Sequence, residues 1–150
     1  MDRASSDRLA IRELIELYSD AVTRRDWNTA GAVFAEDAVW TIGAPTNVEL
    51  RGRAAIAKGV ADMVGAFEVF VQMTHSIVVE LHGDRATART IVNGFGRLRD
   101  RSRGTFTLGT YHDVLTRNGD GWLFQSRRFE PIFIDTAVPL GTAFGPHAAG

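Results

Sequence analysis

The sequence predicts an α+β fold in which amino-terminal helices pack in the concave face of a curved antiparallel sheet. Up to about residue 67, apolar side chains recur at helical spacing, and beyond it they alternate with the period of a strand. The tetrapeptide NGDG (118–121) is a strong signal for a tight hairpin. Helices across the concave side of such a sheet give a cone-shaped half-barrel, whose cavity suits a small apolar ligand.

Three segments predict helices. Ser5 or Ser6 can cap the first helix, over about 7–24, because serine side chains accept hydrogen bonds from the free N–H groups of a first turn. Its apolar side chains recur every three or four residues and therefore share one face. The segment TAGAVFAED (29–37) predicts a short second helix, and residues 53–67 predict a third.

The remaining regular segments are typical of strands. The run AVWTI (38–42) precedes the third predicted helix and is the first of them. The other four follow that helix: 71–81, 86–98, 105–116 and 122–133. Since short turns join these four, we expect them to form an antiparallel meander.

Composition limits the classes of function. The 150 residues fit a single domain over 1–150, with a tail rich in Pro, Gly and Ala at 135–150. A net charge of −1 favours neither nucleic acid nor an anionic membrane surface as a partner. The lack of cysteine excludes disulfides and thiolate metal sites. With no signal segment and no apolar run near the roughly 20 residues of a membrane helix, we expect a cytoplasmic protein.

His75 is the best candidate for acid–base chemistry. In a regular strand it would share a face with Met73 and Ile77 and point into an apolar cup, where a histidine suits proton transfer. The alternative is a core histidine bonded to a backbone carbonyl. His112 and Tyr111 have opposite parity on their strand, so at most one of the two faces the cavity.

A histidine base needs an orienting partner, usually a carboxylate. Asp20 and Asp26, near the end of the first helix, are the acidic candidates. Asp26 also has the sequence context of an N-cap for the second helix. The histidines and acidic residues show no spacing typical of a metal site, and no glycine motif opens a helix, so we expect neither a metal nor a cofactor.

Two stretches, AIRELIELYSDAVTRRDWNTAGAVFAEDAVW and TYHDVLTRNGDGWLFQSRR, resemble the SnoaL-like branch of the nuclear transport factor 2-like superfamily. The resemblance extends over roughly residues 8–134. That branch includes scytalone dehydratase, bile acid 7α-dehydratase and hexachlorocyclohexane dehydrochlorinase, in which a histidine oriented by an aspartate removes a proton while a leaving group departs. The resemblance implies a cofactor-independent lyase or isomerase acting on a small cyclic apolar substrate.

The resemblance also implies roles for individual residues. His75 would be the general base, and Tyr18 would bind the substrate oxygen. Arg127, or Arg128 if the strand is shifted, would line the pocket and stabilise developing negative charge. Trp40 and Tyr111 would shape the cavity.

The chain departs from the family at the aspartate. Members commonly read Asp-x-x-Asp-Trp, whereas VTRRDW (22–27) has Thr23 at the first position and Asp26 at the second. A threonine hydroxyl can bond an imidazole but cannot stabilise an imidazolium as a carboxylate does. Either Asp20, Asp26 or Thr23 orients His75, or the dyad is lost. The alternative function is therefore a non-catalytic protein that binds a small ligand or serves an oxygenase as an accessory subunit.

Apolar side chains occur on both faces of the strand 105–116. Leu108 and Val114 lie opposite Tyr111 and Leu115 in parity. A sheet with two apolar faces needs a cover on each, and the helices can cover only one. We therefore expect a homo-oligomer, either a dimer or a trimer.

Overall fold

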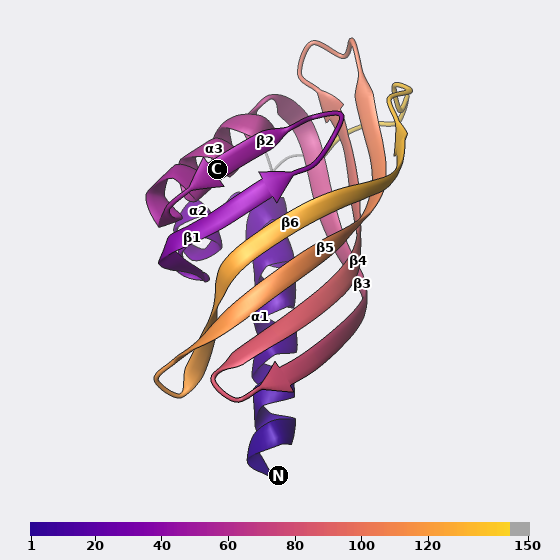
Figure 1. Cartoon of the computed structure of the whole chain (residues 1–150). Coiled ribbons are helices and arrows are strands. Elements are labelled where there is room, and N and C mark those ends of the chain that lie inside the picture. Colours follow the sequence, from indigo (N-terminus) through magenta and orange to yellow (C-terminus); the bar gives the residue numbers. More distant parts are fainter. Residues whose placement is uncertain (145–150) are drawn as a thin grey trace.

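A curved sheet of six strands wraps around the first helix (Figure 1). The computed structural model describes residues 1–144. The elements of this part of the chain are α1 (Arg3–Arg24), α2 (Trp27–Ala32), β1 (Phe34–Ile42), β2 (Val48–Arg51), α3 (Arg53–Gly65), β3 (Phe67–His82), β4 (Arg85–Leu98), β5 (Gly104–Asn118) and β6 (Gly121–Asp135). The predicted fold class is confirmed: the helices come first, and they lie on one face of the sheet.

The sheet is mixed rather than purely antiparallel. Its strand order is β2-β1-β6-β5-β4-β3, and β1 runs parallel to β6 while all other pairs are antiparallel. The expected meander over β3 to β6 is present. It begins at one edge and returns to the centre, where its last strand meets β1. The short strand β2 was not predicted from the sequence.

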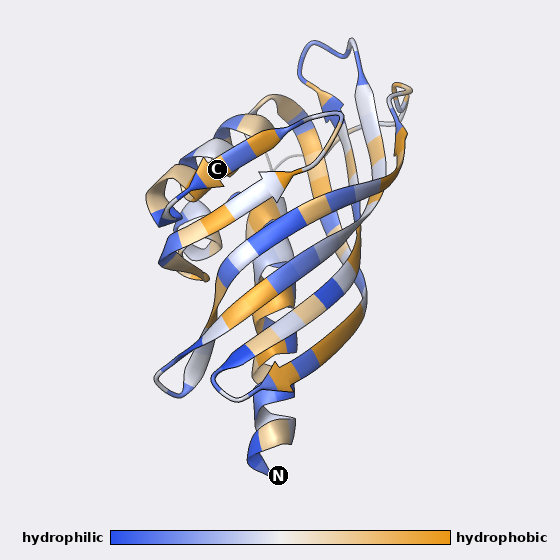
Figure 2. Ribbon diagram, viewed as in Figure 1, coloured by the Kyte–Doolittle hydropathy of each residue, from blue (hydrophilic) through white to orange (hydrophobic). Residues whose placement is uncertain are grey.

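Helix α1 forms the centre of the core. Asp2 caps it by accepting a hydrogen bond from the Ser5 backbone N–H at 2.8 Å, so the predicted serine caps are one turn too late. Ile11, Ile15 and Tyr18 are buried against the sheet. Figure 2 shows this hydrophobic part of α1 where the helix passes behind the strands.

The predicted second helix is too long. Helix α2 ends at Ala32, and Phe34 already belongs to β1. The Phe34 side chain is fully buried, with its ring centroid 5.6 Å from that of Tyr18 and 5.3 Å from that of Phe124. These tertiary contacts outweigh the local helix propensity of the segment.

Strand β3 contains a bulge that reverses its inward and outward positions. Thr74 pairs with Val92 and Ile77 with Thr90, so β3 has one residue more than β4 over this interval. From Phe70 to Thr74 the even-numbered residues face the core, and from Ile77 onward the odd-numbered residues face it. The predicted common face of Met73, His75 and Ile77 is therefore wrong. Met73 and His75 are exposed, and Ile77 is buried.

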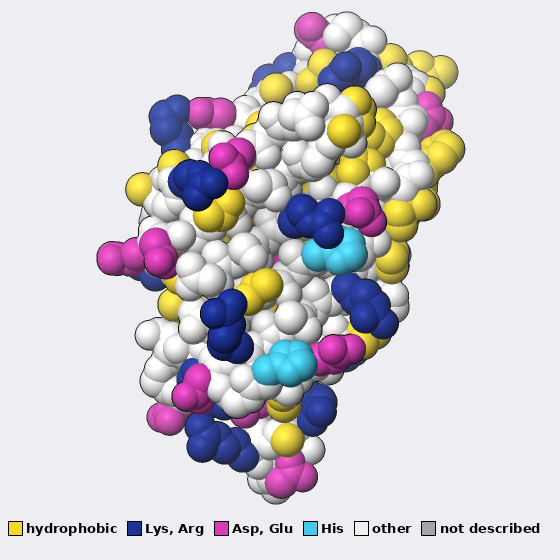
Figure 3. Space-filling view, viewed as in Figure 1, with side chains coloured by type: hydrophobic (Ala, Val, Ile, Leu, Met, Phe, Trp, Pro, Cys, Tyr) yellow, Lys and Arg dark blue, Asp and Glu magenta, His cyan; other side chains and the backbone are white. Residues whose placement is uncertain are grey.

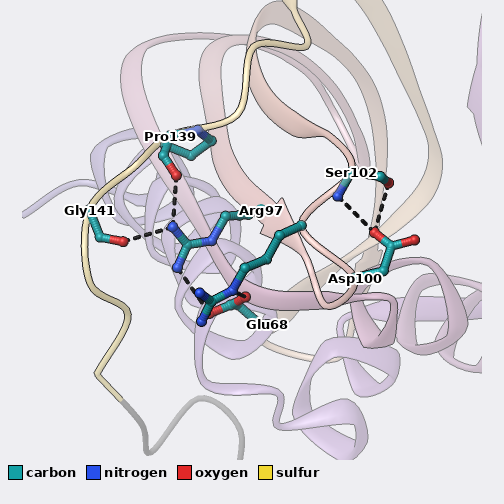
Figure 4. A network of polar contacts seen from close by, with 7 residues as sticks. Glu68, Arg97, Asp100, Ser102, Pro139 and Gly141 are labelled. Carbon is teal, nitrogen blue, oxygen red and sulfur yellow. Dashed lines mark hydrogen bonds and ion pairs between the residues drawn. The ribbon is translucent and has the colours of Figure 1, made fainter.

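The segment after β6 is held against the sheet by a buried arginine. Arg97 Nη1 donates to the carbonyls of Pro139 and Gly141, each at 2.7 Å, and Arg97 Nη2 donates to Glu68 at 2.9 Å (Figure 4). The later part of the predicted tail, which includes His147, lies outside the described residues. Within residues 1–144, no helix is both long enough and apolar enough to cross a membrane.

Candidate ligand-binding cavity

A cavity of about 200 Å³ lies between α1, α3 and the concave face of the sheet. Most of its lining side chains are aliphatic or aromatic. The polar ones are Tyr18, Trp40, Gln72, Thr107 and Tyr111. Within residues 1–144, the lining has no histidine, no carboxylate and no basic side chain. The cavity is therefore an apolar site with a few neutral hydrogen-bonding groups.

Two phenylalanines form one wall of the cavity because glycines face them. The rings of Phe67 and Phe70 lie 5.3 Å apart between centroids. A Cβ atom on Gly94 would lie 3.3 Å from the Phe70 ring, and one on Gly96 would lie 2.9 Å from the Phe67 ring. The GxG of the sequence thus makes room for two aromatic rings.

Hydrogen-bond donors are grouped in another part of the cavity. The rings of Tyr18 and Tyr111 meet edge to face, with centroids 6.2 Å apart. Burial raises the pKa of Tyr18 well above its usual value, and its interaction with Tyr111 raises it further, so its hydroxyl stays protonated. The Trp40 indole N–H has no hydrogen-bond partner among residues 1–144. A ligand oxygen beside Tyr18, Tyr111 and Trp40 could accept a hydrogen bond from a tyrosine hydroxyl or from the indole N–H.

His75 lies outside the cavity. Its side chain is exposed at the bulge of β3, and among the described residues no hydrogen bond joins it to Thr23, Asp20 or Asp26. Asp20 pairs with Arg24 on the surface at 3.0 Å. The predicted base is therefore not brought together with any of its predicted partners.

Asp26 has the structural role that its sequence context predicted. Its carboxylate accepts hydrogen bonds from the Thr29 backbone N–H at 3.2 Å and from the Thr29 hydroxyl at 2.7 Å. These bonds lower the pKa of Asp26, so it remains a charged N-cap of α2. The prediction of an N-cap is confirmed, and the carboxylate is engaged away from His75.

Thr23 contacts Gln72 instead of a histidine. The Thr23 hydroxyl accepts from the Gln72 backbone N–H at 2.9 Å and lies 3.3 Å from the Gln72 carbonyl, to which it can donate. The side chain of Gln72 lines the cavity. In the family resemblance, Thr23 occupies the position of the aspartate that orients the base. Sequence reasoning missed Gln72 because nothing in the sequence marks the bulge.

Arg127 was predicted to line the pocket, and this is wrong. Its guanidinium lies in the core, 1% exposed, and donates to the Asp113 carboxylate at 2.9 and 3.2 Å. Burial lowers the pKa of Arg127, but the adjacent Asp113 more than offsets this and keeps the guanidinium charged. The alternative, Arg128, is half-exposed near Glu130 and does not line the cavity either.

A sequence profile of the SnoaL-like domain matches residues 3–128. The chain belongs to the SnoaL-like family. This SnoaL-like protein is 31% identical over 118 residues to the uncharacterised protein Rv2910c of Mycobacterium tuberculosis, a match that covers 78% of this chain and 80% of that protein.

Solved structures share the fold. A candidate aromatic ring hydroxylase from Novosphingobium aromaticivorans is 25% identical, with a TM-score of 0.81 over 88% of this chain and 94% of that one. Hexachlorocyclohexane dehydrochlorinase LinA-type3 from Novosphingobium barchaimii has a TM-score of 0.82 over 96% and 97% of the two chains, at 18% identity. These likenesses show that the SnoaL-like protein shares its fold with both structures.

Proposed function

We propose that this SnoaL-like protein binds one small, uncharged, cyclic molecule with an acceptor oxygen, and that it does so without a histidine base. The observation that carries the proposal is the lining of the cavity, which within residues 1–144 has no ionisable side chain except tyrosine. The family and the fold shared with a dehydrochlorinase support a lyase-type or isomerase-type scaffold. The residues inside this cavity favour ligand binding over proton abstraction.

The size of the cavity supports a ligand of one or two rings. An apolar cavity of roughly 150 Å³ stays dry and binds benzene. The volume of about 200 Å³ here leaves room for a ring with a small fused or attached group. The aromatic wall of Phe67 and Phe70 offers a flat surface to such a ring.

The charge of the site supports a neutral ligand. An ionised carboxylate loses several kcal/mol of hydration on entering such a site and finds no cationic partner on its lining. A carbonyl or hydroxyl oxygen loses less, and the donors of Tyr18, Tyr111 and Trp40 can replace its water. The site therefore favours a ketone or an alcohol over an acid.

Calorimetric titration with three probes of one shape tests the proposal: 1-indanone, indane and 1-indanecarboxylate. We expect one molecule of 1-indanone to bind with a Kd on the order of 10 µM to 1 mM. Indane should bind more weakly, and the carboxylate should not bind. Tightest binding of the carboxylate, or no binding of any probe, would contradict the proposal.

Hydrogen–deuterium exchange at C2 of 1-indanone tests whether the bound ring meets a base. Because the cavity lining lacks one, we expect the exchange rate to equal that of buffer alone. Protein-accelerated exchange that is lost in His75→Ala would restore the histidine mechanism.

A further inference from the structure

We propose that the buried pair Arg127–Asp113 positions the Tyr18 and Tyr111 rings from behind and polarises their hydroxyls toward the ligand oxygen. Arg127 would thus be a positioning residue that selects for an acceptor oxygen without touching the ligand. The inference rests on the proposed function, because it concerns the same cavity.

The guanidinium of Arg127 is packed among aromatic rings. Its central carbon lies 3.8 Å from the ring centroid of Tyr111, 4.7 Å from that of Tyr18 and 4.3 Å from that of Phe124. Both tyrosines line the cavity, whereas Arg127 does not. The positive charge therefore lies behind the two rings that carry the donor hydroxyls.

Asp113 fixes the orientation of this charge. Its two carboxylate oxygens accept from Nε and Nη2 of Arg127, and the pair is nearly inaccessible to solvent. The remaining nitrogen, Nη1, has no hydrogen-bond partner among residues 1–144. The π faces of the rings carry partial negative charge, and their attraction for the guanidinium partly offsets the hydrogen bond that Nη1 lacks.

Stability alone does not explain such a pair. Replacing a buried ion pair by apolar side chains of similar volume is often neutral or stabilising. A cation at the face of a phenol ring withdraws electron density from it, and the low polarity of the core strengthens this effect. Each hydroxyl then becomes a stronger donor. A ligand with an acceptor oxygen therefore binds more tightly, because it receives a stronger hydrogen bond, whereas the affinity of a hydrocarbon ligand does not change.

The double variant Arg127→Met/Asp113→Leu tests the inference, because it removes both charges and leaves neither unpaired. In the wild type we expect 1-indanone to bind about three to ten times more tightly than indane, the value of one neutral hydrogen bond. In the double variant, indane should bind within about twofold of the wild type, while the preference for 1-indanone should fall at least threefold.

A matched control removes a similar pair far from the cavity. Arg117 bonds Asp7 through two nitrogens and lies over the Trp122 ring at 4.5 Å. Arg117→Met/Asp7→Leu should leave the preference for 1-indanone unchanged. A loss of the preference in this control would show a general effect of weakened packing and overturn the inference.

Arg127→Lys keeps the inference testable if the double variant does not fold. Lysine keeps the charge beside Asp113 but lacks the planar group that stacks on the rings. The preference should fall at least twofold in this variant. A preference that persists in folded variants of Arg127 would overturn the inference and leave the proposed function intact. A wild type that binds neither indane nor 1-indanone would contradict the proposed function itself.

Discussion

Thr23 and Gln72 are joined by two hydrogen bonds that tie the last turn of α1 to β3. The Thr23 hydroxyl serves both the N–H and the C=O of the Gln72 backbone. Strand β3 is an edge of the sheet, so the backbone groups on the side away from β4 have no neighbouring strand to pair with. Thr23 therefore gives the backbone N–H and C=O of Gln72 a hydrogen-bond partner at this edge. It also holds in place the part of β3 that brings Gln72 to the cavity.

Thr23→Val should destabilise the fold by about 1–3 kcal/mol, because it keeps the volume but leaves polar groups of the Gln72 backbone without a partner. Urea unfolding measures the change. Thr23→Ser, which keeps the hydroxyl, is the matched control, and its free energy of unfolding should fall by less than that of Thr23→Val. A loss below about 0.5 kcal/mol in Thr23→Val would show that the two bonds have little effect on stability.

His75 and Gln72 should differ in their effect on ligand binding. His75 is exposed and Gln72 lines the cavity. His75→Ala should leave the Kd for 1-indanone within about twofold, since it changes no surface that a ligand contacts. Gln72→Leu makes the lining more apolar and should tighten indane binding at least threefold. Both values come from calorimetry, and the reverse pattern would restore His75 as a site residue.

The sequence was sufficient to predict the helices-first topology and the meander, because apolar periodicity and the NGDG turn are local signals. The bulge near His75 is not local. It is defined by how β3 pairs with β4, and one extra residue reverses the face of every side chain beyond it. A regular alternation therefore assigned His75 to the cavity and overlooked Gln72.

Arg127 shows a second limit of prediction from sequence. Its neighbours Asp113 and Tyr18 lie on other elements, so the sequence cannot tell a pocket arginine from a buried ion pair. Asp26 was different, because an N-cap depends only on the residues that follow it. The N-cap was therefore predictable, whereas the burial of Arg127 beside Asp113 and under the Tyr18 ring was not.

Asp7 should contribute to the pH dependence of stability. Hydrogen bonds from Arg117 lower the pKa of Asp7 from its ordinary 3.8 to about 2. The folded state therefore resists protonation that the unfolded state accepts. The stabilising contribution of Asp7 is complete above the unfolded pKa and is lost as the pH falls through 3.8 toward 2.

Urea unfolding between about pH 5 and 2 measures this contribution. Asp7→Asn should be less stable than the wild type at pH 5, and the difference should shrink as the pH falls. Asp20→Asn, at an exposed surface pair, is the control and should change the curve little. Curves for Asp7→Asn and wild type that stay parallel would contradict the lowered pKa.

The outer face of the sheet should mediate self-association. Figure 3 shows this face, where hydrophobic side chains gather at the upper right beside charged and histidine side chains. Phe106 on β5 and Phe133 on β6 are 40% and 53% exposed, and their rings lie 6.4 Å apart between centroids. We propose that a second copy of the chain covers this surface.

Light scattering tests the proposed oligomer. The mass should be two or three times the 16.4 kDa of one chain. Phe133→Glu should lower it toward 16.4 kDa, whereas Leu140→Glu, at a position 94% exposed in the segment after β6, should not. A wild-type mass of 16.4 kDa throughout the micromolar range would count against self-association.

A neutral ring with an acceptor oxygen should bind beside Trp40 and away from His75. An NMR titration with 1-indanone tests it most directly, because the indole N–H signals of Trp27, Trp40 and Trp122 report from separate places. Trp40 lines the cavity, and the Trp122 indole is bonded to Asp7 at 3.0 Å. We expect a saturable shift of the Trp40 signal, with the other two indole signals and the His75 ring signals unchanged. A shift of the His75 ring with an unchanged Trp40 signal would contradict it.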